Sequence, residues 1–214
     1  MARVREKIFS MIHIIDYGLG NVQAFLTMYK RLGFETTRAR QSSDLNGAKK
    51  IILPGVGSFD NAIKLLNESG MQSTLNSLVL DDKVPVLGIC VGMQILASRS
   101  DEGVLDGLGW IPGSVNAFNN NLNSTDFPLP HMGWNEVHSC AEHPLFVGLE
   151  KNAKFYFLHS YYFECELNSN NAATSYYGIK FSSAVSSRNV YGVQFHPEKS
   201  HTFGAQLLKN FAEL

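Results

Sequence analysis

A cysteine near the middle of the chain has the setting of a catalytic nucleophile. Cys90 lies in the segment GICVG (residues 88–92), between an apolar strand-like run and a helix-like segment. A cysteine at such a strand-to-helix turn follows the nucleophile-elbow pattern, and the helix N-terminus beyond it stabilises a thiolate. Since a free thiol has a pKa of about 8.5, only a few per cent is ionised at neutral pH without such help. The five residues alone also fit a buried structural cysteine at a tight turn.

A histidine and a glutamate in QFHPE (194–198) supply what a thiol nucleophile needs. In an extended backbone, side chains two residues apart point to the same face, and Pro197 disfavours a helix, so His196 and Glu198 are expected to emerge together. A carboxylate beside an imidazole fixes its tautomer and stabilises the imidazolium. Alone, the pair also fits a strand end that faces solvent. Beside the GICVG turn, it predicts a triad of Cys90, His196 and Glu198.

A third segment offers backbone donors for the same reaction. PGVG (54–57) follows an apolar run and precedes a helix-like segment. Acyl transfer through a tetrahedral intermediate needs backbone N–H groups aimed at the developing oxyanion. Two glycines allow such a strand end to adopt unusual dihedral angles or to flip a peptide. The segment is therefore a candidate oxyanion loop, although a plain turn fits it too.

These residues require a scaffold of alternating strands and helices. Apolar runs at 12–15, 51–53 and 84–89 are predicted as strands, each followed by a turn and an amphipathic helix. Gly33 suits the end of the first helix and Ser58 the N-cap of the second. The pattern predicts a single α/β domain with a largely parallel central sheet flanked by helices.

The second half of the chain has a different pattern of predicted elements. Strands are predicted at 155–158, 184–187 and 190–195, joined by turns rich in Gly, Asn and Pro, which favours an additional antiparallel region. The final helix is expected to pack on the sheet, because its apolar residues share one face. These residues are Phe203, Leu207, Leu208 and Phe211.

Composition limits the kinds of function. The chain has 214 residues, 44% of them hydrophobic, which suffices for one sizeable core. A formal net charge of -1 gives no basic surface for nucleic acid or for a membrane, so neither is a predicted partner. Three widely spaced cysteines indicate reduced thiols and a cytoplasmic location rather than a disulfide framework.

The first ten residues are basic, and the apolar stretch after them is interrupted at Asp16. It is too short for a membrane span or for the core of a signal peptide. Met11 is a possible natural start. We therefore expect residues 1–10 to be an N-terminal extension and residues 11–214 to form the domain.

Several segments together resemble the class I glutamine amidotransferases: GICVGMQIL, LPGVGSFDNAI, PHMGWNEV, FYFLHSYY and YGVQFHPEKS. With the opening IIDYGLGN, they are most similar to the glutaminase subunits of imidazole glycerol phosphate synthases. The resemblance runs from about Ile12 to the C-terminus and implies the class I glutaminase fold.

The resemblance also implies a mechanism. Cys90 attacks the carboxamide of glutamine, His196 acts as base and then as acid to the leaving ammonia, and Glu198 orients His196. A glutamyl thioester forms and is hydrolysed. In the family, one oxyanion donor is thought to require a peptide flip triggered by the partner's ligand, which leaves the isolated glutaminase nearly silent. The implied oxyanion hole consists of backbone groups at Val56, Gly57 and Val91.

The resemblance also implies a set of binding residues, and it implies no cofactor and no metal. Glutamine is expected to contact Gln94, His159, Ser160 and Tyr161. Residues expected to face the partner are Asn21, Tyr156 and Lys199. The implied partner is a TIM-barrel cyclase subunit, forming a heterodimer that uses the ammonia on a phosphoribosyl nucleotide in histidine biosynthesis.

Other interpretations stay open. A paralogous subunit that supplies ammonia to a sugar amidotransferase in surface polysaccharide synthesis has the same motifs, and a non-catalytic binding subunit shares the fold. The GLGN turn after Asp16 resembles a dinucleotide-binding loop, but Gln23 stands where the third glycine belongs. A zinc site at His138, Cys140 and His143 lacks a second ligand pair at structural spacing.

Overall fold

The computed structural model describes residues 11–118, 126–140 and 142–214. The predicted extension at 1–10 lies outside the described residues, so its role stays a prediction. Within the described ranges, no helix has both the length and the apolar character that crossing a membrane requires.

Five parallel strands form the centre of the sheet. Strand β1 (Ile12–Ile15) lies between β2 (Thr36–Ala39) and β3 (Lys50–Gly55), and the sheet continues through β4 (Val86–Cys90) to β13 (Val190–Val193). Strands β1, β3 and β4 are buried at every position. Continuous apolar runs of this kind are typical of parallel strands that are covered on both faces. The predicted parallel sheet is confirmed.

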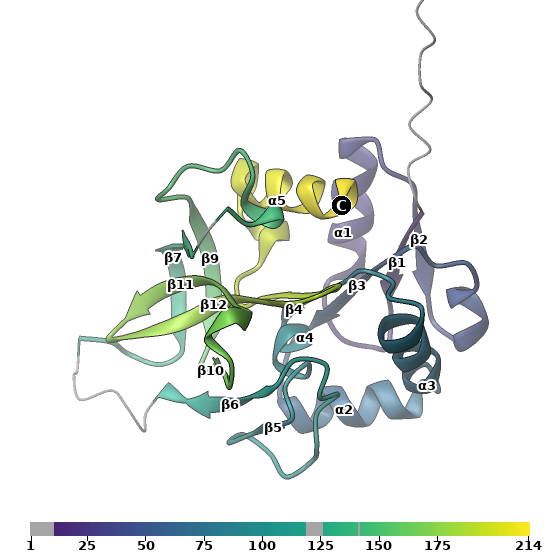
Figure 1. Ribbon diagram of the computed structural model, residues 1–214, viewed down its shortest axis with the longest axis horizontal. Coiled ribbons are helices and arrows are strands. Elements are labelled where there is room, and N and C mark those ends of the chain that lie inside the picture. Colours follow the sequence, from purple (N-terminus) through teal and green to yellow (C-terminus); the bar gives the residue numbers. More distant parts are fainter. Residues whose placement is uncertain (1–10, 119–125, 141) are drawn as a thin grey trace, which may run out of the picture.

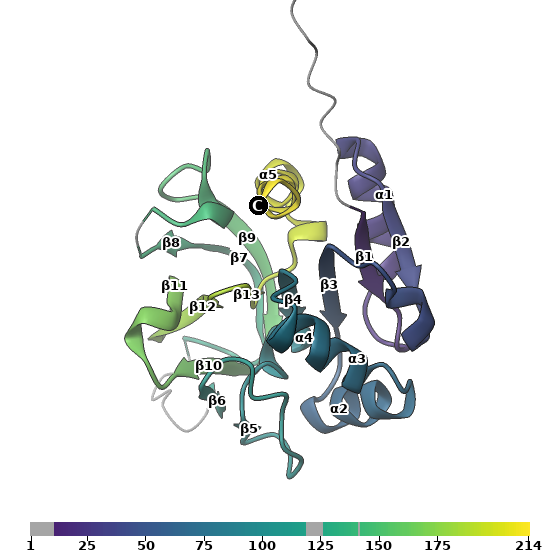
Figure 2. The same cartoon turned by 45° about the vertical axis from the view of Figure 1, so that its right-hand side comes forward.

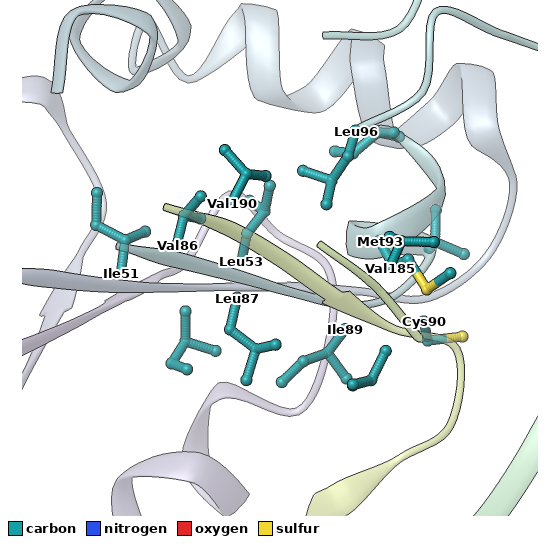
Figure 3. Close-up of a cluster of buried hydrophobic side chains, with 14 of the residues drawn as sticks. Ile51, Leu53, Val86, Leu87, Ile89, Cys90, Met93, Leu96, Val185 and Val190 are labelled. Carbon is teal, nitrogen blue, oxygen red and sulfur yellow. The ribbon is translucent and has the colours of Figure 1, made fainter. Parts of the chain in front are cut away.

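Helices cover both faces of these strands. Helices α1 (Val22–Leu32) and α5 (His201–Glu213) lie on one face, whereas α2 (Phe59–Glu68), α3 (Gln72–Asn76) and α4 (Val91–Gln94) lie on the other (Figures 1 and 2). In Figure 3, Leu87 and Ile89 project to the face opposite Val86 and Leu53, and the sulfur of Cys90 lies at the strand end. The core therefore fills both sides of the sheet up to the nucleophile.

The remaining strands extend the sheet on one side, mostly in the antiparallel sense. They are β12 (Ile179–Ser187), β10 (Tyr161–Cys165), β6 (Gly113–Ala117), β5 (Arg99–Ser100), β11 (Asn171–Tyr177) and β8 (His138–Ser139). The order is β2-β1-β3-β4-β13-β12-β10-β6-β5, with β11 branching from β12 and β8 pairing with β11. Strands β7 (His131–Glu136) and β9 (Lys154–His159) form a separate antiparallel sheet. The expected antiparallel region is confirmed.

Short helical turns complete the described fold. They are η1 (Ser42–Leu45), η2 (Ser77–Asp81), η4 (Pro144–Phe146), η5 (Asn168–Asn170) and η6 (Pro197–Lys199). Gly33 ends α1 with φ 81°, as predicted. Ser58 occupies the predicted N-cap position of α2 in an extended conformation, but its side chain makes no capping hydrogen bond.

One prediction about the loop at 54–57 is wrong in part. Pro54 and Gly55 belong to strand β3 and pair with Ile89 and Cys90 of β4, so the turn starts only at Val56. Proline is tolerated in a central strand only where no ladder hydrogen bond is needed from its nitrogen. That condition is met here because the pairing of β1 with β3 stops at residue 52.

Candidate active site

Cys90 sits at a strained turn between β4 and α4. Its dihedral angles are φ 56° and ψ -115°, a region that non-glycine residues rarely occupy, and its side chain is 4% exposed. A Cβ on Gly88 would collide with the carbonyl of Gly92, and a Cβ on Gly92 would collide with the carbonyl of Leu53. The two glycines therefore allow the backbone to pack closely enough for the elbow, which confirms the predicted geometry.

The histidine and the glutamate lie together in the fold, but not through an extended backbone. His196 is extended, whereas Pro197 opens the 3₁₀ turn η6, contrary to the prediction that proline disfavours a helix here. Proline fits the first position of a helical turn because its missing N–H has no intrahelical partner there. The turn brings Glu198 Oε1 to 2.8 Å from His196 Nδ1, with both side chains buried.

The protonation state of His196 follows from these contacts. Burial by itself lowers the pKa of the imidazole, but hydrogen bonds with Cys90 and with the carboxylate of Glu198 raise it more, to about 9. His196 is therefore protonated at neutral pH.

Ser200 supports this arrangement and was not identified from the sequence. Its Oγ donates to the carbonyl of His196 at 2.6 Å and accepts from the N–H of Tyr156 at 3.0 Å. The N–H of His196 donates to the carbonyl of Tyr156 at 2.8 Å. The only sequence signal was its place before the final helix, where serine is a common N-cap.

A pocket of about 260 Å³ opens beside Cys90. Its walls come from β4, α4, β9 and β10, from the segments that follow β3, β5 and β13, and from the residue before β7. The lining residues are Val56, Gly57, Cys90, Val91, Gln94, Glu102, Pro130, Leu158, His159, Ser160, Tyr161 and His196. The predicted nucleophile, base, oxyanion-hole residues and substrate-binding residues therefore meet in one cavity, while Glu198 lies against His196 outside the lining.

The candidate oxyanion loop is held in place by the GLGN turn. Gly55 is the register partner of Cys90, so the strand leads directly to Val56 and Gly57 beside the sulfur. Tyr17 donates its hydroxyl to the carbonyl of Pro54 at 2.9 Å. A Cβ on Gly20 would lie 2.7 Å from the Cβ of Pro54, and Gly20 has φ 84°. The turn thus packs against β3.

Two of the predicted substrate-binding side chains are already engaged with the protein. Gln94 donates its Nε2 to the carbonyl of Tyr161 at 3.3 Å and to Oε1 of Gln194 at 3.1 Å. His159 uses both ring nitrogens, with Nε2 2.9 Å from His131 Nδ1 and Nδ1 2.7 Å from the carbonyl of Tyr161. His159 lines the pocket without a free ring nitrogen, whereas the amide oxygen of Gln94 accepts no hydrogen bond from the described residues.

Glu102 is a pocket residue that the sequence did not reveal. Its Oε2 accepts from the N–H of Phe59 at 2.8 Å, and burial raises the pKa of the carboxyl group. A carboxylate in a pocket of this size can form a charge-assisted bond with the ammonium group of an amino acid. From the sequence, Glu102 is an acidic residue in a loop, and such residues are common on protein surfaces, so nothing indicated a place in the pocket.

The residues predicted to face a partner lie outside the pocket. Lys199 Nζ is 5.5 Å from the centre of the Tyr156 ring, which packs edge-on against Trp134. Trp134 in turn stacks on His201. Asn21 is exposed and caps α1 by accepting from the N–H of Ala24.

The zinc hypothesis has no geometric support. His138 lies beside the carbonyl of Lys151, and His143 beside the hydroxyl of Ser186. Across residues 11–118, 126–140 and 142–214, no group of three or more His, Cys, Asp or Glu side chains is arranged to hold a metal ion.

The sequence around this site matches a known protein family. The model of the glutamine amidotransferase class I family matches residues 13–214, which include the elbow, the pocket and the triad. The chain belongs to the class I glutamine amidotransferase family. It is accordingly an amidotransferase by class, an enzyme type that takes nitrogen from the carboxamide of glutamine.

Relatives agree with the amidotransferase assignment, and a solved structure shares the fold. The chain is 60% identical to the imidazole glycerol phosphate synthase subunit HisH of Bdellovibrio bacteriovorus and 50% identical to that of Leptospira interrogans, covering 95% of this chain and 100% of each relative. The crystal structure of a glutamine amidotransferase has the same fold, with a TM-score of 0.72 at 21% identity, covering 94% of this chain and 97% of that one.

Proposed function

We propose that this chain is the glutaminase subunit of an imidazole glycerol phosphate synthase, with Cys90, His196 and Glu198 as its catalytic triad. The observation that carries the proposal is a buried Cys-His-Glu set beside a pocket, in a chain that is 60% identical over 95% of its length to a subunit of that name. A cytoplasmic location remains the prediction made from its cysteines.

The geometry supports a two-step hydrolysis. The thiolate of Cys90 attacks the carboxamide carbon of glutamine, and the oxyanion of the tetrahedral intermediate accepts from the N–H of Val91 and from one at the Val56–Gly57 peptide. His196 then gives its proton to the leaving nitrogen, so ammonia departs and a glutamyl thioester remains. In the second step His196 takes a proton from water, the hydroxide adds to the thioester, and glutamate leaves as the thiol is restored.

Gln94, Ser160 and Tyr161 are proposed to hold the glutamine, together with the backbone of His159. Glu102 is added to this set, because it is the carboxylate among the residues that line the pocket. An anionic group in the lining favours a ligand with a free amino group. The pocket volume of about 260 Å³ suits one amino acid rather than a peptide.

A partner that receives the ammonia is proposed to dock on the sheet formed by β7 and β9. Met132 and Trp134 are 65% and 48% exposed, unusual for large apolar side chains, and Leu158 on the neighbouring strand is 37% exposed and also lines the pocket. Tyr156 and Lys199 continue this surface. A partner seated there covers the mouth of the pocket and prevents loss of ammonia to solvent.

The proposed partner is a TIM-barrel cyclase subunit, giving a heterodimer. The relatives are named as subunits, which supports a second chain, and the name of their synthase supports a cyclisation step. The alternative, a subunit that serves a sugar amidotransferase, has no comparable support among these relatives. A non-catalytic binding subunit is disfavoured by the complete triad.

Replacement of the nucleophile tests the proposal. In the reconstituted complex, Cys90→Ala should abolish glutamine-dependent synthesis while synthesis from added ammonium salt continues at the wild-type rate. Cys165→Ala is the matched control, since Cys165 lies outside the pocket, and it should leave both activities unchanged. Undiminished glutamine hydrolysis by Cys90→Ala would contradict the assignment.

A further inference from the structure

A chain of hydrogen bonds runs from strand β7 to the wall of the pocket. Asn135 Nδ2 lies 3.2 Å from His131 Nε2, His131 Nδ1 lies 2.9 Å from His159 Nε2, and His159 Nδ1 lies 2.7 Å from the carbonyl of Tyr161. The two imidazoles are only 3% and 6% exposed. The same carbonyl accepts from Gln94 Nε2. This series of hydrogen bonds therefore ends at Gln94, whose amide oxygen is left for a ligand.

The donor and acceptor of every hydrogen bond in this series are fixed by the groups at its two ends, the amide of Asn135 and the carbonyl of Tyr161. The amide nitrogen of Asn135 can only donate, and its orientation is set because it also donates to the carbonyl of Tyr176 while its oxygen accepts from the N–H of Glu136. His131 must then accept at Nε2 and donate from Nδ1. His159 likewise accepts at Nε2 and donates from Nδ1 to a carbonyl, which can only accept.

Both imidazoles must be neutral for this series of hydrogen bonds to form. A proton on Nε2 of His131 or of His159 would place two donors face to face. Burial agrees, since it lowers the pKa of His131 to about 4 and that of His159 to about 3. The wall of the pocket is thus held by a single arrangement of protons.

We propose that His131 is a positioning residue for glutamine binding, which acts through His159 on the carbonyl of Tyr161 and so fixes the amide of Gln94. With its two N–H groups committed to Tyr161 and Gln194, that amide cannot rotate and presents only its oxygen to the pocket. It therefore selects a ligand that offers an N–H donor. This inference rests on the proposed glutaminase function and adds a determinant of substrate affinity to it.

The alternation along β7 explains how one strand can have two roles. His131 and Asn135 point inward to the hydrogen-bond chain, whereas Met132 and Trp134 are exposed on the proposed docking surface. Residues that shape the pocket wall and residues that meet a partner thus occupy opposite faces of the PHMGWN segment.

A role in packing alone is the competing explanation. The His131 ring stacks on Phe157 and on Tyr177, with centroids 4.8 Å and 4.0 Å apart. Two variants separate the roles. His131→Phe keeps an aromatic ring and removes the donor, whereas His131→Asn removes the ring and keeps a nitrogen donor near the position of Nδ1.

Steady-state kinetics of the reconstituted complex test the inference. His131→Phe should raise the KM for glutamine about 10-fold or more, as expected when a buried hydrogen bond is lost, with kcat changed far less. His131→Asn should keep a KM close to that of the wild type, even if its melting temperature falls further. An unchanged KM in His131→Phe, or equal KM increases in both variants, would overturn the inference.

A second measurement does not depend on activity. Long-range ¹⁵N–¹H spectra of the histidine rings at pH 7 should show His131 and His159 as neutral Nδ1–H tautomers in the full-length protein. An imidazolium or an Nε2–H tautomer at either residue would overturn the inference even in an active glutaminase. Absence of glutamine turnover by the wild-type complex, with both tautomers as expected, would instead remove the proposed function.

Discussion

Glu198 Oε1 lies 2.8 Å from His196 Nδ1, and neither side chain is more than 4% exposed. The carboxylate is one of the two groups that raise the pKa of His196 to about 9. In Glu198→Gln the hydrogen bond can remain while the charge is lost, so the pKa of His196 should fall. We expect glutamine-dependent kcat/KM to drop on the order of 10²-fold and its alkaline limb to move to lower pH.

The pH profile of glutamine-dependent kcat/KM measures this effect. Glu68→Gln is the control, because Glu68 is an exposed carboxylate paired with Lys64 on helix α2, and its profile should match the wild type. An unshifted alkaline limb in Glu198→Gln would show that the carboxylate does not set the protonation of His196.

Glu102 should determine affinity for glutamine rather than turnover. Glu102→Gln keeps an oxygen for the N–H of Phe59 and removes the charge beside the pocket. Hydrogen bonds to charged groups contribute about 1.5–3 kcal/mol, so the KM for glutamine should rise about 10- to 100-fold with little change in kcat. Steady-state kinetics at saturating partner concentration check this, and a lower kcat at constant KM would contradict it.

Tyr17 should stabilise the end of β3. Tyr17→Phe leaves the buried carbonyl of Pro54 without its donor, which should cost about 1–3 kcal/mol in the free energy of unfolding and lower the glutaminase kcat. Tyr29→Phe is the matched control, since no described group bonds to the buried Tyr29 hydroxyl. Equal denaturant midpoints for the two variants would show that the hydroxyl of Tyr17 does not hold the strand.

Trp134 is expected to be a major contact on the proposed docking surface. Trp134→Ala should weaken association with the cyclase subunit by 10-fold or more, because large aromatic residues near the centre of an interface contribute about 2 kcal/mol or more. Its melting temperature should change little, since the side chain is 48% exposed. Val147→Ala, at an exposed apolar position outside the β7–β9 sheet, should bind the partner normally. Calorimetric titration measures both.

Acid should destabilise the fold through the buried histidine pair. The pKa of His131 falls from 6.5 to about 4 on folding and that of His159 to about 3. Below pH 6.5 the unfolded chain therefore binds protons that the folded chain does not, and stability is lost as the pH falls toward 4. His131→Phe should reduce this loss by about 1–3 kcal/mol. Urea unfolding at pH 7 and pH 5 measures the difference, and parallel losses would contradict it.

Local patterns made much of this molecule predictable. The elbow at Cys90 depends on a strand, a tight turn and a helix that are adjacent in sequence, so residue order alone indicates it. The turn at Pro197 was misjudged because proline suits both an extended chain and the first position of a 3₁₀ turn. The extension of β3 through Pro54, and the roles of Glu102 and Ser200, depend on contacts with distant segments, which periodicity does not encode.

Strand β13 pairs in parallel with β4, and this pairing places His196 next to Cys90. The two sites are about a hundred residues apart in the chain, and Gln194 Nε2 donates to Cys90 Sγ at 3.9 Å across that separation. A nascent chain that ends before residue 196 therefore contains the proposed nucleophile but lacks its proposed base. On the proposed mechanism an unfinished subunit cannot hydrolyse glutamine, because the last central strand to be made leads into the proposed base.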